Sequence, residues 1–186
     1  MTTLKSTTLA LALAAVPALA LAHPQAGGAH THGFFDGFAH PFTGLDHLLA
    51  MLAVGIWSAR QKQGSALPLA FLAAMLFGVL SGVAGLVIPG LETGIALTVA
   101  VLGVLIAVAA RLPAGAGMLM VAAFAVLHGN AHGHELPQAA SAFGLLLASA
   151  MLIAAGRAAA KVSPALMVKL SGAAIAATGL LLVASA

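Results

Sequence analysis

The most restrictive feature of this sequence is a succession of long apolar segments that contain almost no charged residues. From residue 41 onward, six segments follow one another, each close to the ~20 residues that a helix needs to cross a bilayer. Their residues run without interruption in Ala, Leu and Val, whereas the strands of a membrane barrel alternate apolar and polar residues. We therefore predict an all-α, polytopic membrane protein with six transmembrane helices. The predicted spans are 43–60, 66–88, 92–110, 114–132, 138–157 and 164–185.

The composition of the chain excludes several other classes of protein. Only 6% of the 186 residues are charged, whereas a soluble domain carries roughly 25%. Four acids and seven bases cannot cover a soluble surface of this size, which excludes an ordinary cytosolic enzyme and a disordered chain. The few bases are scattered, which argues against nucleic-acid binding although the pI is near 10. A sequence without cysteine cannot form disulfides, iron–sulfur clusters or thiolate metal sites.

The N-terminal 22 residues have the organisation of a secretory signal peptide. Lys5 precedes a short apolar stretch, and the small residues Ala20 and Ala22 occupy the two positions that a signal peptidase reads. We predict cleavage after Ala22 rather than retention of an additional helix. The predicted organisation is a signal peptide at 1–22, a periplasmic histidine-containing segment at 23–40, and a six-helix transmembrane domain at 41–186.

The basic residues orient the predicted helices. If the mature N-terminus lies outside, six crossings place the loops 60–65, 111–113 and 157–163 in the cytoplasm. The four acids and the eight histidines lie toward the other side. This positive-inside pattern predicts a bacterial inner-membrane protein with both termini in the periplasm. The predicted cytoplasmic side carries every Lys and Arg of the mature chain, namely Arg60, Lys62, Arg111, Arg157, Lys161 and Lys169.

Two polar clusters interrupt the apolar sequence and carry its candidate chemistry. The first is HPFTGLDH at 40–47, and the second is HGNAHGHE at 128–135. A helix rise of ~1.5 Å per residue puts both clusters roughly 20–30 Å from the cytoplasmic surface, in the outer third of the membrane. Within the second cluster, His128, His132 and Glu135 are spaced to share one helix face. We expect the clusters to meet, because they come from different helices at the same depth.

The residue types in these clusters predict a divalent metal site. Ionisable groups inside a membrane are costly and mark functional sites. Imidazole and carboxylate without thiolate suit Ni²⁺, Co²⁺, Zn²⁺ or Mn²⁺. Asp46 can either bind metal or orient a histidine by accepting its N–H. The candidate ligands are His40, Asp46, His47, His128, His132 and Glu135.

Five further residues are secondary candidates for metal binding. His134 falls on a different face from His132 and close to the aqueous edge. Glu92 opens the third span, where it serves either as an N-terminal helix charge or as a residue of the pore mouth. His23, His30 and His32 either collect metal from the periplasm or belong to a solvated tail.

The positions of the two clusters also indicate an internal symmetry. The first cluster begins a span that runs inward, and the second ends a span that runs outward. This placement is typical of an inverted repeat of three helices each.

At these clusters the sequence resembles the HupE/UreJ family of bacterial nickel/cobalt permeases. The family motif HPxxGxDH is matched in full at 40–47, and FHGxAHGxE is matched at 127–135 except that Leu127 replaces Phe. The resemblance covers the whole chain. It implies secondary uptake of Ni²⁺ or Co²⁺ from periplasm to cytoplasm, a functional link to hydrogenase or urease, and no tightly bound cofactor. It also implies metal binding by His40, Asp46, His47, His128, His132 and Glu135.

Three other functions are compatible with parts of the pattern. His128 and His132 with nearby Glu135 resemble the zinc site of an intramembrane hydrolase that uses a carboxylate base. Two facing histidines could also bind haem in an electron carrier, and the chain could be a structural subunit. A hydrolase predicts no accumulation of nickel in cells, and a structural subunit predicts that His47→Ala and His132→Ala have no effect on it. A haem carrier would be coloured when purified.

Histidine ligation predicts that uptake depends on pH. Imidazole binds metal only when deprotonated, so we expect nickel uptake to weaken below about pH 6.5. Initial uptake rates measured in cells across this range test the expectation. Rates that stay constant down to about pH 5 would argue strongly against histidine ligands.

Overall fold

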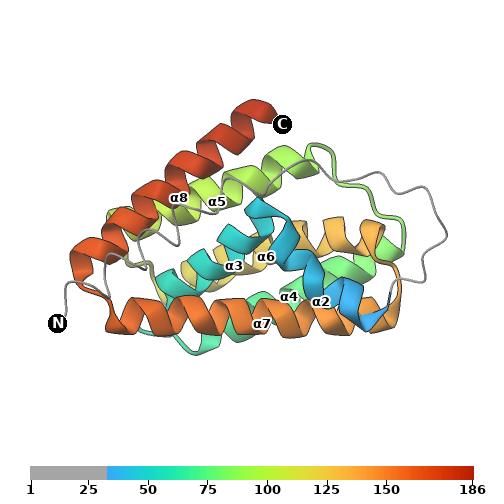
Figure 1. Cartoon of the computed structure of the whole chain (residues 1–186), viewed down its shortest axis with the longest axis horizontal. Coiled ribbons are helices and arrows are strands. Elements are labelled where there is room, and N and C mark those ends of the chain that lie inside the picture. The colour runs from blue at the N-terminus through green and yellow to red at the C-terminus, as the bar shows by residue number, and fades with distance from the viewer. Residues whose placement is uncertain (1–32) are drawn as a thin grey trace.

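The computed structural model describes residues 33–186, which fold into helices joined by short connections (Figure 1). The predicted signal peptide and the histidines His23, His30 and His32 lie outside the described residues. No strand occurs between residues 33 and 186, which confirms the all-α prediction for this part of the chain. The helices are α2 (Phe34–Thr43), α3 (Leu45–Ser58), α4 (Ala66–Val83), α5 (Leu91–Ala107), α6 (Ala114–Glu135), α7 (Ala139–Val162) and α8 (Ala165–Ser185).

Four of these helices are long and apolar enough to cross a membrane. They are α4, α6, α7 and α8, with 18, 22, 24 and 21 residues, and they correspond to the second, fourth, fifth and sixth predicted spans. The first and third predicted spans contain the shorter apolar helices α3 and α5, with 14 and 17 residues. Helix α3 begins late because Gly44 has an extended backbone that separates it from α2. Helix α5 ends before Ala109, whose φ of 52° forms a left-handed turn. Six membrane crossings therefore remain a prediction.

Glycines allow the helices to pack in close pairs. Helix α4 packs on α6, α5 packs on α8, and α7 contacts α2 and α3 in succession (Figure 1). Gly78 and Gly82 of α4 lie against Gly129 and Gly133 of α6, and a Cβ at any of the four would collide with the facing backbone. Small residues four positions apart permit this close approach in helices that pack inside membranes.

The strongest helix pairings are preserved when the two halves of the chain are exchanged, although the α3–α5 contact has no comparable α6–α8 counterpart. Replacing α3, α4 and α5 by α6, α7 and α8 turns the α3–α7 contact into the α4–α6 contact and leaves the α5–α8 contact in place. The glycine contacts show α4 running parallel to α6, and α5 running antiparallel to α8. This arrangement agrees with the inverted repeat that the positions of the two clusters indicate.

One end of the bundle is basic. The guanidinium of Arg60 donates to the carbonyl of Ala160, and that of Arg157 donates to the carbonyl of Gly64. Arg60 also lines a cavity of about 130 Å³ together with Arg111 and Lys169. We call this region the basic end, and its cations are among those that the sequence places in the cytoplasm.

We predict that Gly78→Ala destabilises the bundle. The new Cβ would lie about 3.0 Å from the backbone nitrogen of Asn130, and overpacking of this kind costs about 1–3 kcal/mol. The thermal unfolding midpoint of the protein in detergent should therefore fall. In the control Gly115→Ala, the Cβ meets no atom within 4 Å, so the midpoint should be unchanged or slightly higher. An unchanged midpoint for Gly78→Ala would contradict the close approach of α4 and α6.

Candidate metal site

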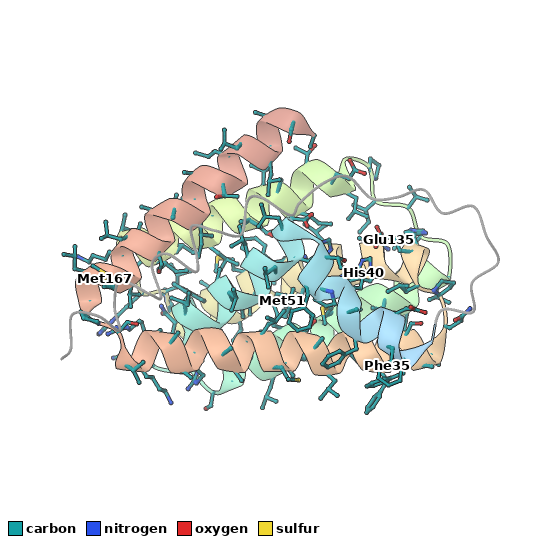
Figure 2. The ribbon with its side chains drawn as sticks, in the orientation of Figure 1. Phe35, His40, Met51, Glu135 and Met167 are labelled. Atoms are coloured by element: carbon teal, nitrogen blue, oxygen red, sulfur yellow. The ribbon has the colours of Figure 1, made fainter. Side chains whose placement is uncertain are left out.

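Four histidines from three helices gather at the end of the bundle opposite the basic end. Helix α2 provides His40, α3 provides His47, and α6 provides His128 and His132. The ring centroid of His132 lies 4.3 Å from that of His47 and 4.8 Å from that of His40, and the His47 ring lies 5.0 Å from the His128 ring. Figure 2 shows His40 close to Glu135 of α6. The two sequence clusters therefore meet in the fold, at what we call the histidine end.

One part of this group combines two imidazoles with a carboxylate. The Nε2 atom of His40 lies 2.9 Å from Oε2 of Glu135, and Nδ1 of His132 lies 3.7 Å from the same oxygen. One potential ligand atom of each residue lies within 4.8 Å of the other two. Bonds of about 2.0–2.2 Å from one ion would bring such atoms roughly 3–4 Å apart. These three residues, which we call the carboxylate trio, are thus close to the spacing that one divalent ion requires.

The other part of the group is a pair of more deeply buried imidazoles, His47 and His128. His47 is 6% exposed and His128 is fully buried. The Oδ1 atom of Asp46 accepts hydrogen bonds of 2.8 Å from both the backbone N–H and Nδ1 of His47. Because a carboxylate only accepts, Nδ1 carries the hydrogen and Nε2 carries the lone pair. Asp46 therefore orients His47, which is the second of the two roles that the sequence allows.

Three imidazole nitrogens of this group are buried without a hydrogen-bond partner. They are Nε2 of His47, Nδ1 of His128 and Nδ1 of His132, and Oδ1 of Asn130 is the other such atom in residues 33–186. Each unpaired buried polar atom costs about 1–3 kcal/mol. A metal ion that accepts nitrogen lone pairs would offset this cost, so the donor atoms fit a divalent transition metal.

The local backbone makes room for the Asp46–His47 pair. Pro41 lies inside α2, and the chain becomes extended at Gly44 before α3 begins. A Cβ at Gly44 would lie 3.0 Å from Oδ1 of Asp46 and 3.2 Å from Nδ1 of His47. Glycine at this position therefore permits the hydrogen bond that orients His47.

The two secondary candidates within the described residues, His134 and Glu92, do not join the histidine group. His134 Nε2 donates a 3.0 Å hydrogen bond to the carbonyl of Leu86. Glu92 lies in the first turn of α5, and with His134 it lines a cavity of about 370 Å³ at the histidine end. Both proposed roles of Glu92, the helix charge and the mouth residue, are compatible with this position. Asp46, His47 and Glu135 also line this cavity.

Comparison with known proteins identifies the family of the chain. Residues 11–182 match the family described as HupE / UreJ protein. The chain is also 42% identical to Protein HupE of Rhizobium leguminosarum bv. viciae over 139 residues, which is 74% of this chain and 71% of that protein. The chain belongs to the HupE/UreJ family. No solved structure matches the chain significantly.

Membership of the HupE/UreJ family confirms the resemblance that the two motifs predict. The family consists of nickel/cobalt transporters, so this member is a multi-pass membrane protein of metal transport and not an enzyme. The hydrolase alternative, which rested on the spacing of His128, His132 and Glu135, is thereby set aside.

Two polar residues of this HupE/UreJ protein are missing from the sequence prediction: Thr98 contacts a site histidine, and Asn130 anchors the helix that carries two of them. Oγ1 of Thr98 in α5 lies 2.9 Å from Nε2 of His128. Asn130 donates from Nδ2 to Oγ of Ser81 and to the carbonyl of Leu86, which ties α6 to the end of α4. Asn130 lies within the second motif and could have been selected. The sequence could not have indicated Thr98, because a single threonine is common in apolar helices. Its partner His128 is also 30 positions away along the chain.

We predict that Asp46→Ala weakens nickel binding about 10- to 100-fold, the usual effect of removing the acceptor behind a metal-binding histidine. The dissociation constant can be measured by calorimetry on the purified protein in detergent. Asp36→Ala is the control, because the Asp36 carboxylate accepts from the backbone of Gly33 at the start of α2 and its removal costs the same charge. Equal affinity in wild type and Asp46→Ala would contradict the orienting role.

Proposed function

We propose that this protein is a secondary permease that takes up Ni²⁺, or alternatively Co²⁺, from the periplasm to the cytoplasm. The observation that carries the proposal is the set of three buried imidazole nitrogens without a hydrogen-bond partner, one of which, Nδ1 of His132, belongs to the carboxylate trio. Nitrogen and oxygen donors without sulfur suit both ions. Membership of a nickel/cobalt transporter family and similarity to a protein named HupE support metal uptake.

The cavity at the histidine end serves as the entrance in this proposal. Its lining includes the carboxylates of Asp46, Glu92 and Glu135 and the imidazoles of His47 and His134. Carboxylates that line a concave surface raise the local concentration of cations. The periplasmic histidines His23, His30 and His32 would deliver metal to this entrance. The metal then reaches Glu135, which belongs to both the cavity lining and the carboxylate trio.

The ion then passes from the carboxylate trio to the buried imidazole pair. His132 links the two positions, because its ring lies 4.8 Å from that of His40 and 4.3 Å from that of His47. Glu135 provides negative charge at the first position, and Asp46 provides it behind His47 at the second. Water is lost in stages as imidazole nitrogens replace it.

Passage beyond the imidazole pair requires a conformational change. Toward the basic end, the interior contains the fully buried side chains of Met51, Phe71 and Met75. We infer that the two halves of the inverted arrangement rock against each other and expose the ion to the cytoplasm. An inside-negative potential contributes ~2.3 kcal/mol per charge per 100 mV, and about twice that for a divalent ion.

The orientation and processing of the protein complete the proposal. Residues 1–22 are removed as a signal peptide, and the six apolar segments between 43 and 185 cross the inner membrane. The basic end faces the cytoplasm, and the histidine end and both termini face the periplasm. The imported metal supplies hydrogenase or urease maturation.

Uptake of radioactive nickel into cells tests this function. Wild type should accumulate the metal, and His47→Ala and His132→Ala should each abolish accumulation because each removes a buried nitrogen of the site. Asp36→Ala, at the start of α2, should transport like wild type at equal protein level. No accumulation by wild type, or full activity of both histidine variants, would refute the proposal.

A further inference from the structure

We propose that Thr98 is a positioning residue that holds the His128 ring so that Nδ1, not Nε2, binds the metal. The inference rests on the proposed function, since it assigns a ligand atom within the same site. Thr98 is 2% exposed and lies in α5, a helix that carries none of the six principal candidate ligands. Its hydroxyl lies within hydrogen-bond distance of Nε2 of His128.

The hydrogen atoms around the Thr98 hydroxyl can be assigned from its two contacts. Oγ1 lies 2.7 Å from the carbonyl oxygen of Ile95 and 2.9 Å from Nε2 of His128. A carbonyl oxygen only accepts, so the single hydroxyl hydrogen points to Ile95. The hydroxyl oxygen must then accept from His128, which places a hydrogen on Nε2.

This assignment leaves the lone pair of His128 on Nδ1. A neutral imidazole has one N–H and one unprotonated nitrogen. Nδ1 of His128 is buried and has no hydrogen-bond partner, and its ring lies edge-on to the His47 ring at an interplanar angle of 88°. His47 has the opposite arrangement, because Asp46 holds its Nδ1–H and leaves Nε2 free. The two neighbouring histidines therefore present different nitrogens to the same site.

The hydrogen bond also connects two parts of the fold. Thr98 belongs to the α5–α8 pair, and His128 belongs to the α4–α6 pair. The ring of His128 keeps its orientation only while α5 stays against α6. Thr98 thus makes the affinity of the site depend on the contact between these pairs.

Nickel binding by Thr98 variants of the purified full-length protein tests the proposal. Thr98→Val has nearly the same shape but no hydroxyl, and its dissociation constant should rise about 10- to 100-fold. Thr98→Ser restores the hydroxyl and should recover most of the affinity. The control Thr178→Val removes a hydroxyl that donates to the carbonyl of Ala174 on α8, and it should bind like wild type. Equal affinity in Thr98→Val and wild type would overturn the proposal.

A direct measurement of the His128 tautomer is independent of metal binding and of how well the Thr98 variants fold. ¹⁵N NMR of the metal-free wild type, with His128→Gln to assign the signals, should show hydrogen on Nε2 and none on Nδ1. Hydrogen on Nδ1 would overturn the proposal even if Thr98→Val failed to fold. Wild type that binds no nickel but shows the expected tautomer would instead count against the proposed function.

Discussion

The burial of imidazole nitrogens inside an apolar bundle is the constraint on which the rest of the structure depends. Each ring must direct one nitrogen to a protein partner or leave it unpaired at a cost. Asp46 satisfies one nitrogen of His47, and Thr98 satisfies one of His128. Nε2 of His47 and Nδ1 of His128 remain without a partner, while Glu135 holds one oxygen within 4 Å of His40 and His132. Unpaired buried nitrogens lower the stability of the fold, but together with a nearby carboxylate they are suitable ligands for a divalent cation.

Close helix packing allows a small protein to build this site. The glycines Gly129 and Gly133 lie between and beside the histidines of α6, and they bring the α6 backbone against α4. The adjacent face of α6, about 100° around the helix, is then free to present His128 and His132 to α2, α3 and α5. The break at Gly44 lets α2 and α3 contribute one histidine each. Within one short motif, the glycines therefore serve helix packing and the histidines next to them form the candidate metal site.

The two ends of the bundle differ in charge, as the proposed transport from periplasm to cytoplasm requires. Carboxylates line the cavity at the histidine end, whereas Arg60, Arg111 and Lys169 line the smaller cavity at the basic end. In the proposed orientation the basic end faces the cytoplasm, where loops rich in Lys and Arg are retained. In the proposed function the carboxylates attract the cationic cargo. The inverted pairing of the helices supplies two halves that can move against each other.

The sequence by itself determined the helical class, the family, and the residues of both motifs. Continuous apolar runs predict helices, and the two short motifs at 40–47 and 128–135 identify the candidate chemistry without any knowledge of packing. Tertiary structure decided which role each polar residue has. It made Asp46 an orienting acceptor, turned His134 toward Leu86, and selected Thr98 from an otherwise ordinary apolar helix. It also delayed the start of the first predicted span to Leu45. The reason is physical: a side chain's partner depends on which helices approach each other and in what rotation, and spacing along one helix does not contain that information.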